Sequence, residues 1–374
     1  MEVKGVNSEG GVTEQDEQWM RRALRLAARG KGLASPNPMV GAVVVRDGKV
    51  VGESFHRYDR VLHAEVAALK QAGEAARGAD LYVTLEPCCH VGRTPPCIDC
   101  IIAAGVRRVF IATEDPNPQV RGRGIASLRR EGIEVHVGLL REEAVRLNEA
   151  FFFAMEHGRP LVTLKLGLTL DGRIAAWDGS SRWITSEASR RKVHQMRFEA
   201  DAVLVGIGTI LADDPSLDVR GARRKRIQKV VLDSGLRTPP EARLFSSQDP
   251  VVIFHGPNAG GPDRRRLQSR ADLVGVRRAR YGLDWCRILE ELHRRQIRHV
   301  VVEGGAHVAT SLVAHVRPVR VALFYSPKFL GSEGLPCIRS LGKRPVTEAL
   351  ALKDVTWKRI GEDLMLAGVL REVE

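Results

Sequence analysis

The chain has 374 residues, of which 44% are hydrophobic and 28% are charged, values typical of a soluble globular protein large enough for two domains. Its longest apolar runs are far shorter than the roughly 20 residues of a membrane span, and its N-terminus lacks the apolar core of a signal peptide. We therefore expect a cytoplasmic protein with no membrane partner. The net charge of +13 indicates anionic partners, either nucleic acid or phosphorylated metabolites.

The N-terminal part of the chain alternates helix and strand patterns. A loose arm at residues 1–13 ends at Thr13, which caps a predicted helix that reaches Gly30. Two apolar runs on either side of Asp47-Gly48 predict a β-hairpin. The elements predicted after it are a helix over 63–71, a strand over 81–85, a helix over 97–105, a strand over 107–113, a helix over 125–130 and a strand over 133–138. This alternation predicts a layered α/β domain over residues 14–150.

The pattern resets between residues 145 and 160, after an aromatic triplet at 151–153. Strand patterns then resume at LVTLKLGL, DAVLVGI, KVVLDS, PVVIFH, HVVVEGG and VALFYSP, which predict a second α/β domain over residues 151–374. Gly304 and Gly305 follow one of these strands and open a predicted helix. The free N–H groups at the start of such a helix can receive a pyrophosphate.

The residue types of a zinc deaminase occur in the N-terminal half. Such an enzyme needs one histidine and two cysteine ligands, together with a carboxylate that carries protons without binding the metal. His63 and Glu65 stand two positions apart, and Pro87-Cys88 follows them. On a regular helix these two side chains point about 200° apart. This geometry favours His63 as a ligand at the helix start and Glu65 as the proton carrier.

The second sulfur ligand is ambiguous, because four of the six cysteines lie between positions 88 and 100. Pro96-Cys97 with Cys100 matches the P-C-x-x-C pattern literally. We favour Cys88, at the end of a predicted strand, and Cys97, at a helix N-terminus that stabilises a thiolate. Cys89 and Cys100 are then packing residues.

At this point the sequence resembles a known family, the bifunctional riboflavin-biosynthesis deaminase-reductases. The matching motifs, which span roughly residues 14–370 in the family's order, are SPNPMVGAVVV, HAEVAALK, TLEPCCHVGRTPPC, ATEDPNPQVRGRGI, TLKLGLTLDGRIA, WITS, VLVGIGTILADDPSLDVR, VVLDSGLRTPP, VVEGGAHVA and SPKFLG. The resemblance implies a cytidine-deaminase-like α/β/α zinc domain followed by a dihydrofolate-reductase-like α/β domain. It also implies two steps, the hydrolytic deamination of a phosphoribosylamino-pyrimidine and the NADPH-dependent reduction of its ribosyl chain to ribityl.

For the deaminase half, the resemblance implies one zinc ion per chain, held by His63, Cys88 and Cys97, with Glu65 as the catalytic proton carrier. The residues implied to hold the pyrimidine and its phosphate are Asn37, His56, His90 and Arg93. The chain departs from the family at Arg60-Val61-Leu62, where Gly-x-Pro is usual, at Ala67, where a histidine is common, and at Val91, a variable position. We expect these departures to affect the substrate loop and not the metal.

For the reductase half, the resemblance implies a dimer through this domain and two groups of contacts. The residues implied to contact the substrate are Ser181, Arg197, Leu217, Arg220 and Glu303. The residues implied to contact NADPH are Gly167, Trp183, Thr209, Asp213, Gly305, Ala306, His307, Val308, Ala309, Thr310 and Ser311. Lys165 is a candidate for polarising the sugar carbonyl, although it also fits as an ordinary charged residue of a strand.

Two other functions compete with this one. A nucleic-acid-editing deaminase with a basic C-terminal extension fits the charge, but the second half lacks a clustered aromatic and basic platform, and aromatic residues are only 5% of the chain. A non-catalytic zinc module requires a fourth ligand, which Cys89 or Cys100 would have to supply. The expected partners are therefore phosphorylated small molecules and not nucleic acid.

Overall fold

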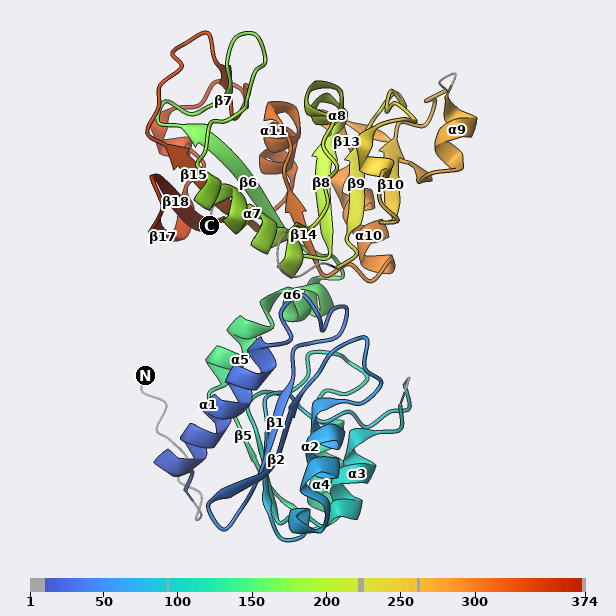
Figure 1. Ribbon diagram of the computed structural model, residues 1–374, viewed down its shortest axis with the longest axis vertical. Coiled ribbons are helices and arrows are strands. Elements are labelled where there is room, and N and C mark those ends of the chain that lie inside the picture. Colours follow the sequence, from blue (N-terminus) through green and yellow to red (C-terminus); the bar gives the residue numbers. More distant parts are fainter. Residues whose placement is uncertain (1–10, 93, 221–224, 261–262, 372–374) are drawn as a thin grey trace. The chain divides into compact units, whose positions relative to one another are not determined.

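The computed structural model describes residues 11–92, 94–220, 225–260 and 263–371 (Figure 1). Most of the predicted N-terminal arm, and Arg93, lie outside the described residues. The chain divides into two compact units between Glu156 and His157. Among the described residues, no helix combines the length and the apolar character that a membrane crossing requires.

A five-stranded sheet with the order β2-β1-β3-β4-β5 forms the centre of the first unit. The predicted hairpin is confirmed as antiparallel strands β1 and β2, while β3, β4 and β5 are parallel to one another. The strands are β1 (Gly41–Arg46), β2 (Lys49–Phe55), β3 (Asp80–Val83), β4 (Arg108–Ile111) and β5 (Glu134–Val137). Alternate side chains of β1, β3 and β4 point to opposite faces, so both faces of the sheet need a cover.

Helices cover both faces of this sheet. α1 begins with a capping box in which Thr13 and Asp16 exchange hydrogen bonds, and its Met20 and Ala23 pack on one face beside α5. α2, α3 and α4 bury Ala68, Ile101 and Leu128 against the other face. The helical elements are α1 (Glu14–Ala28), α2 (Ala64–Ala72), η1 (Gly73–Ala76), α3 (Cys97–Ala104), α4 (Arg123–Arg130), α5 (Arg141–Leu147) and α6 (Glu149–His157). The predicted α/β/α layering is therefore confirmed.

The second unit contains a nine-stranded sheet with the order β11-β10-β9-β8-β14-β6-β15-β18-β17. Its first seven strands are parallel, and β18 and β17 add an antiparallel hairpin. The strands are β6 (Leu161–Thr169), β8 (Ala202–Gly206), β9 (Gln228–Leu232), β10 (Val251–His255), β11 (Asp272–Gly275), β14 (His299–Val302), β15 (Val319–Ser326), β17 (Leu352–Ile360) and β18 (Asp363–Leu370). Two small pairs join β7 (Arg173–Ala175) to β16 (Leu335–Pro336) and β12 (Arg278–Ala279) to β13 (Gly282–Leu283).

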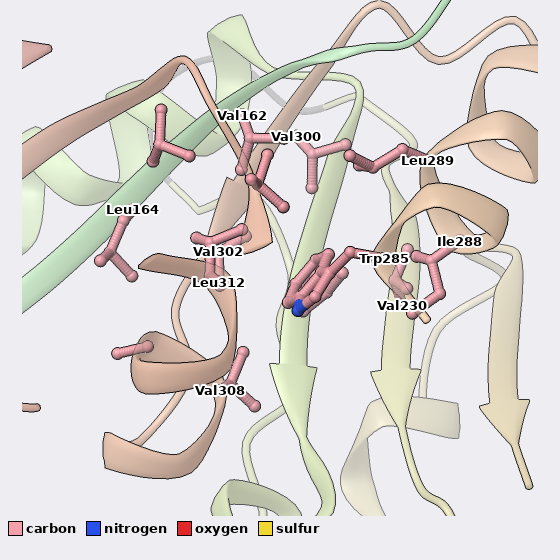
Figure 2. Packing of buried hydrophobic residues seen from close by; sticks show 14 of the residues in the cluster. Val162, Leu164, Val230, Trp285, Ile288, Leu289, Val300, Val302, Val308 and Leu312 are labelled. Carbon is pink, nitrogen blue, oxygen red and sulfur yellow. The ribbon is translucent and has the colours of Figure 1, made fainter. Parts of the chain in front are cut away.

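The larger core of this unit lies between the sheet and helices α10 and α11 (Figure 2). Trp285 of α10 is buried there, and its indole N–H donates to Ser311 Oγ at 2.9 Å. α7 covers the opposite face, where its Val193 meets Ala322 and Phe324 of β15. The remaining helical elements are α7 (Glu187–Glu199), α8 (Ile207–Asp213), η2 (Arg243–Phe245), α9 (Arg264–Gln268), α10 (Trp285–Arg294), α11 (Ala306–His315) and η3 (Val346–Glu348).

Candidate active sites

Three elements of the first unit bring His63, Cys88 and Cys97 together. His63 is the N-cap of α2, Cys97 is the first residue of α3, and Cys88 lies in the loop after β3. Their ligand atoms all lie within 4.8 Å of one another, and no other group of metal-ligating side chains this compact occurs among the described residues. Cys89 and Cys100 instead pack against the core.

The distances in this group suit a tetrahedral zinc ion. His63 Nδ1 lies 3.0 Å from Cys97 Sγ and 3.5 Å from Cys88 Sγ. A shared zinc ion holds one nitrogen and two sulfur ligands about 3.5–3.8 Å apart, so only small shifts are needed. The Cys97 backbone N–H donates to Cys88 Sγ at 3.3 Å, as expected for a sulfur that carries negative charge. The donor set and its spacing therefore fit a zinc ion.

The pKa values of Cys88, Cys97 and Glu65 also fit metal binding and proton transfer. A hydrogen bond with Cys97, aided by His63, lowers the pKa of Cys88 to about 4. The same contact raises the pKa of Cys97, since the two sulfurs share one proton. Burial raises the pKa of Glu65 to about 7. A carboxyl group that titrates near neutral pH is suited to accept a proton and then release it.

Two of the residues predicted to hold the pyrimidine lie beside the metal ligands. The imidazole of His56 stands edge-on to that of His63, with ring centres 5.3 Å apart, and Asn37 Nδ2 lies 3.1 Å from His56 Nε2. His90 follows Cys88 by two positions, and its Nδ1 is buried without a hydrogen-bond partner among the described residues. An unpaired polar atom of this kind is available to a ligand.

Glu86, a buried carboxylate two residues before Cys88, is a site residue that was not predicted from the sequence. Its oxygens accept backbone N–H groups from Gly122, Gly124 and Ile125 at 2.9–3.2 Å, and also from Asp115 at 3.2 Å. Glu86 therefore fastens the cysteine loop to the N-terminus of α4. A glutamate at the end of a buried strand was a signal in the sequence, but its four partners are distant along the chain.

The second unit contains a cavity of about 1650 Å³ at the carboxyl ends of β6, β8, β9 and β14. A crevice at this edge is the usual ligand site of an open α/β sheet. The predicted substrate residues, Lys165 and all predicted cofactor residues except Ala309 line it. Ala309 of α11 is fully buried in the core and does not line the cavity.

A buried ionic cluster forms part of the cavity wall. Glu303, directly after β14, binds Arg197 of α7 through two hydrogen bonds of 2.5 and 3.1 Å, and Lys165 Nζ lies 3.8 Å from Glu303 Oε2. Burial alone would raise the pKa of Glu303, but the charges of Arg197 and Lys165 hold it at about 2. Burial lowers the pKa of Lys165 despite the opposing effect of Glu303. Such a lysine can donate a proton more readily than an exposed one.

The N-terminus of α11 faces the cavity at Gly305 and Ala306. Among the described residues no side chain caps this end, so the N–H groups of its first turn are available to an anion. A Cβ added to Gly305 would meet nothing within 4 Å. The uncapped helix end and the open cavity beside it fit the pyrophosphate of a dinucleotide.

The cavity also contains residues that the sequence analysis missed. Ser234 lines it just beyond β9, and His194 of α7 has a buried Nδ1 without a hydrogen-bond partner among the described residues. The guanidinium of Arg190 lies 4.2 Å from the ring centre of Trp183. Further arginines in the lining are Arg182, Arg237, Arg243, Arg280 and Arg339. The cavity wall is therefore strongly basic, as an anionic ligand requires.

Two family models match the chain in succession. The cytidine and deoxycytidylate deaminase zinc-binding region matches residues 13–113, and the RibD C-terminal domain matches residues 160–366. The riboflavin biosynthesis protein RibD of Aquifex aeolicus (strain VF5) is 43% identical over 95% of this chain and 98% of its own length. RibD of Escherichia coli (strain K12) is 39% identical over 94% of this chain and 98% of its own length.

Solved structures agree with the sequence matches. RibD of Acinetobacter baumannii has a TM-score of 0.88 and 33% identity, and the match covers 96% of this chain and 99% of that one. A Thermotoga maritima protein described as a diaminohydroxyphosphoribosylaminopyrimidine deaminase/5-amino-6-(5-phosphoribosylamino)uracil reductase has a TM-score of 0.83 and 38% identity. That match covers 95% of this chain and 98% of the other. Both similarities extend across the two units.

Proposed function

Because the chain belongs to the RibD family of bifunctional deaminase-reductases of riboflavin biosynthesis, we propose that it catalyses two consecutive steps on one phosphorylated pyrimidine. The first step hydrolyses an amino group of diaminohydroxyphosphoribosylaminopyrimidine. The second reduces the ribosyl chain of 5-amino-6-(5-phosphoribosylamino)uracil to ribityl. We assign deamination to residues 14–150 and reduction to residues 151–374. The observation that carries the proposal is the pairing of a His-Cys-Cys group in one unit with a basic cavity in the other.

In the first step, Glu65 moves a proton between water and the leaving amino group. His63, Cys88 and Cys97 would hold one zinc ion, which supplies the Lewis acid that activates water for attack. Glu65 accepts a proton from the attacking water and passes it to the amino nitrogen, which leaves as ammonia. Asn37, whose amide both donates and accepts hydrogen bonds, orients the pyrimidine together with His56 and His90. Arg93, which lies outside the described residues, is proposed to bind the phosphate.

In the second step, the cavity wall orients the sugar and stabilises the charge that develops on it. A bound NADPH supplies the hydride. Lys165 donates a proton to the sugar oxygen as the neighbouring carbon accepts the hydride, and Glu303 holds the Lys165 amino group in place. Arg220 binds the phosphate. Arg197, which is paired with Glu303, also lines the cavity wall.

NADPH is proposed as the reductant in place of NADH because of the basic lining of the cavity. An arginine near the ribose can pair with the 2′-phosphate, and several arginines line this cavity. The first turn of α11 would receive the pyrophosphate, with Thr209, Asp213 and Trp183 as further contacts. The Thr310 hydroxyl donates to Ala306 O, whereas Ser311 Oγ accepts from the Trp285 indole and is proposed to donate its own proton to the cofactor.

A homo-oligomer formed through the second unit is also proposed. Strand β17 is the last strand of the sheet, and most of its residues are exposed, including Trp357 at 58%. A long exposed edge strand with an apolar side chain is a common pairing surface. Sedimentation analysis would measure the oligomeric state, and replacement of Trp357 by Lys should weaken the association between copies of the chain.

The full-length relatives favour this function over a nucleic-acid-editing deaminase. The match continues through the second unit, where an editing enzyme needs only a basic extension. The partners are accordingly small phosphorylated molecules, and the cytoplasmic location remains an expectation. Ammonia release measured with the pyrimidine, and in parallel with single-stranded nucleic acid, tests the choice. We expect ammonia release with the pyrimidine and not with the nucleic acid. Ammonia release with the nucleic acid and not with the pyrimidine would refute the proposed function.

A further inference from the structure

Lys229 is a charged residue near the start of β9, and its side chain is fully buried. Successive side chains of a strand alternate between faces, and its neighbour Val230 belongs to the hydrophobic core, so Lys229 projects from the other face. An ammonium group removed from water is costly unless it is fully paired. Here its Nζ donates to Asp218 Oδ1 at 2.7 Å, Leu244 O at 2.9 Å and Ser247 Oγ at 2.8 Å.

Asp218 is the partner that connects Lys229 to the cavity. It lies beside Leu217 and two positions before Arg220, in the loop to which the substrate contacts were assigned. Burial would raise the pKa of Asp218, but the hydrogen bond and charge of Lys229 outweigh burial and lower it. The Asp218 carboxylate is therefore stabilised in its charged form. A second carboxylate, that of Asp249, lies 3.6 Å from Lys229 Nζ.

The loop needs an anchor because its backbone conformation is unfavourable. Leu217 has a φ of 59°, in the left-handed region that a branched side chain seldom adopts, and it is almost fully buried. Such a conformation persists only where the surroundings hold it. The Asp218 side chain is fixed by Lys229, and the Asp218 carbonyl accepts a hydrogen bond of 3.1 Å from Arg197.

Arg220 depends on the same turn. Its Nη2 donates to Ser216 Oγ at 2.9 Å, across Leu217 and Asp218, and the side chain lines the cavity. A shift of Asp218 would therefore move both Leu217 and Arg220. It would also remove a partner of Arg197, which in turn holds Glu303.

We propose that Lys229 is a positioning residue of the reductase, which acts through Asp218 to present Leu217 and Arg220 to the phosphorylated sugar. This inference rests on the proposed function, because the ligand of the loop is taken to be the phosphoribosyl group. Lys229 itself does not line the cavity and contacts neither substrate nor cofactor. Its effect should therefore appear in substrate recognition and not in cofactor binding.

The test uses the full-length chain with Lys229→Met, which removes the charge and keeps most of the volume. We expect the KM for the deaminated substrate to rise by about tenfold, since displacements of about 1 Å in a site can cost up to about 10²-fold. The kcat at saturating substrate should stay within about twofold, and NADPH affinity in a direct titration should not change. Asp201→Asn is the matched control. Its carboxylate accepts the N–H groups of Arg298 and His299 at the amino ends of β8 and β14, and Asp201 does not line the cavity, so its KM should equal that of the wild type.

Asp218→Asn provides a second variant in case Lys229→Met does not fold. If Lys229 acts through Asp218, this variant should raise the KM similarly, and the double variant should be no worse than either single one. Asp218→Asn with a wild-type KM would overturn the inference, as would equal losses of NADPH and substrate affinity in Lys229→Met. A wild-type chain that never oxidises NADPH with this substrate would refute the proposed function instead.

Discussion

At the scale of single residues, metal binding and proton transfer in the first unit are assigned to two different side chains, those of His63 and Glu65. His63 is the N-cap of α2 with an extended backbone, whereas Glu65 is in the first helical turn. The change of backbone conformation between them points the imidazole toward Cys88 and Cys97 and leaves Glu65 outside the ligand group. Metal binding and proton transfer should therefore respond to different substitutions.

The first prediction concerns the sulfur atoms. Replacement of Cys88 or Cys97 by Ser should each abolish zinc binding and deamination, because a site with three protein ligands loses a thiolate that a hydroxyl does not replace. Zinc content per chain, measured by atomic emission, checks this. Cys89→Ala and Cys100→Ala are the controls and should keep most of the zinc. Zinc lost from Cys100→Ala and kept by Cys88→Ser would show that the ligand set is wrong.

The second prediction concerns Glu65. Glu65→Gln keeps the size of the side chain but removes its ability to carry a proton, so deamination should fall by at least ~10²-fold while the zinc content stays unchanged. Ammonia release and metal analysis of the same preparation measure the two effects. Reduction of substrate that is already deaminated should persist. Normal deamination by this variant would require a different proton carrier.

The third prediction concerns Arg220, whose guanidinium lines the cavity and is held by Ser216. Arg220→Ala should raise the KM for the deaminated substrate, because a phosphate loses a charged hydrogen-bond donor. NADPH affinity should remain nearly unchanged. Cofactor titration followed by turnover across substrate concentrations separates these quantities. Loss of NADPH binding with substrate recognition intact would place the cofactor on this loop instead.

At the scale of elements, the uncapped start of α11 yields a fourth prediction. Gly305→Asp should cap the first turn, which stabilises the helix slightly. The same carboxylate would occupy the N–H groups and repel a pyrophosphate, so NADPH affinity should fall by at least about tenfold. Thermal unfolding and NADPH titration measure the two effects. Gly305→Ala is the control, since it adds a methyl group without a charge. Unchanged NADPH affinity in Gly305→Asp would exclude this helix end as the pyrophosphate site.

The sequence predicted elements well where one pattern dominates. Most parallel strands of the second sheet were predicted because residues such as Val203 and Val301 form continuous apolar runs, but β11 was missed because it is short and only partly buried. Strands β17 and β18 were missed, since exposed residues fill β17, and the residues of β18 are nearly all apolar, so its sequence does not show the alternation of its burial. Helix α7 was also missed, because only Val193, Phe198 and Ser189 of its residues are buried.

The candidate sites likewise contain residues that could be predicted from the sequence and residues that could not. Residues within short motifs, such as His63 and Cys88, could be placed from the sequence because their spacing reflects local chemistry. Glu86 and Lys229 could not, since each acts through partners more than ten positions away that only the fold brings near. Ala309 was assigned by its place in a motif, although the helix turns its side chain into the core.

At the scale of the whole molecule, each unit has its own sheet and its own core. The first unit is built around residues such as Val44 and Ile101, and the second around Leu204 and Trp285. Among the described residues, the metal ligands come from the first unit and the cavity lining comes from the second. Each reaction should therefore respond to substitutions in its own unit alone, and the two reactions should be linked through the deaminated intermediate.

The most direct test of this account is to incubate the zinc-loaded chain with the diamino-pyrimidine substrate, with and without NADPH, and to follow the products by mass. Without NADPH, the account predicts ammonia and the deaminated ribosyl compound, with no further change. With NADPH, it predicts the ribityl product and one NADPH oxidised per molecule formed. Oxidation of NADPH before any ammonia is released, or accumulation of the deaminated compound with NADPH untouched, would contradict it.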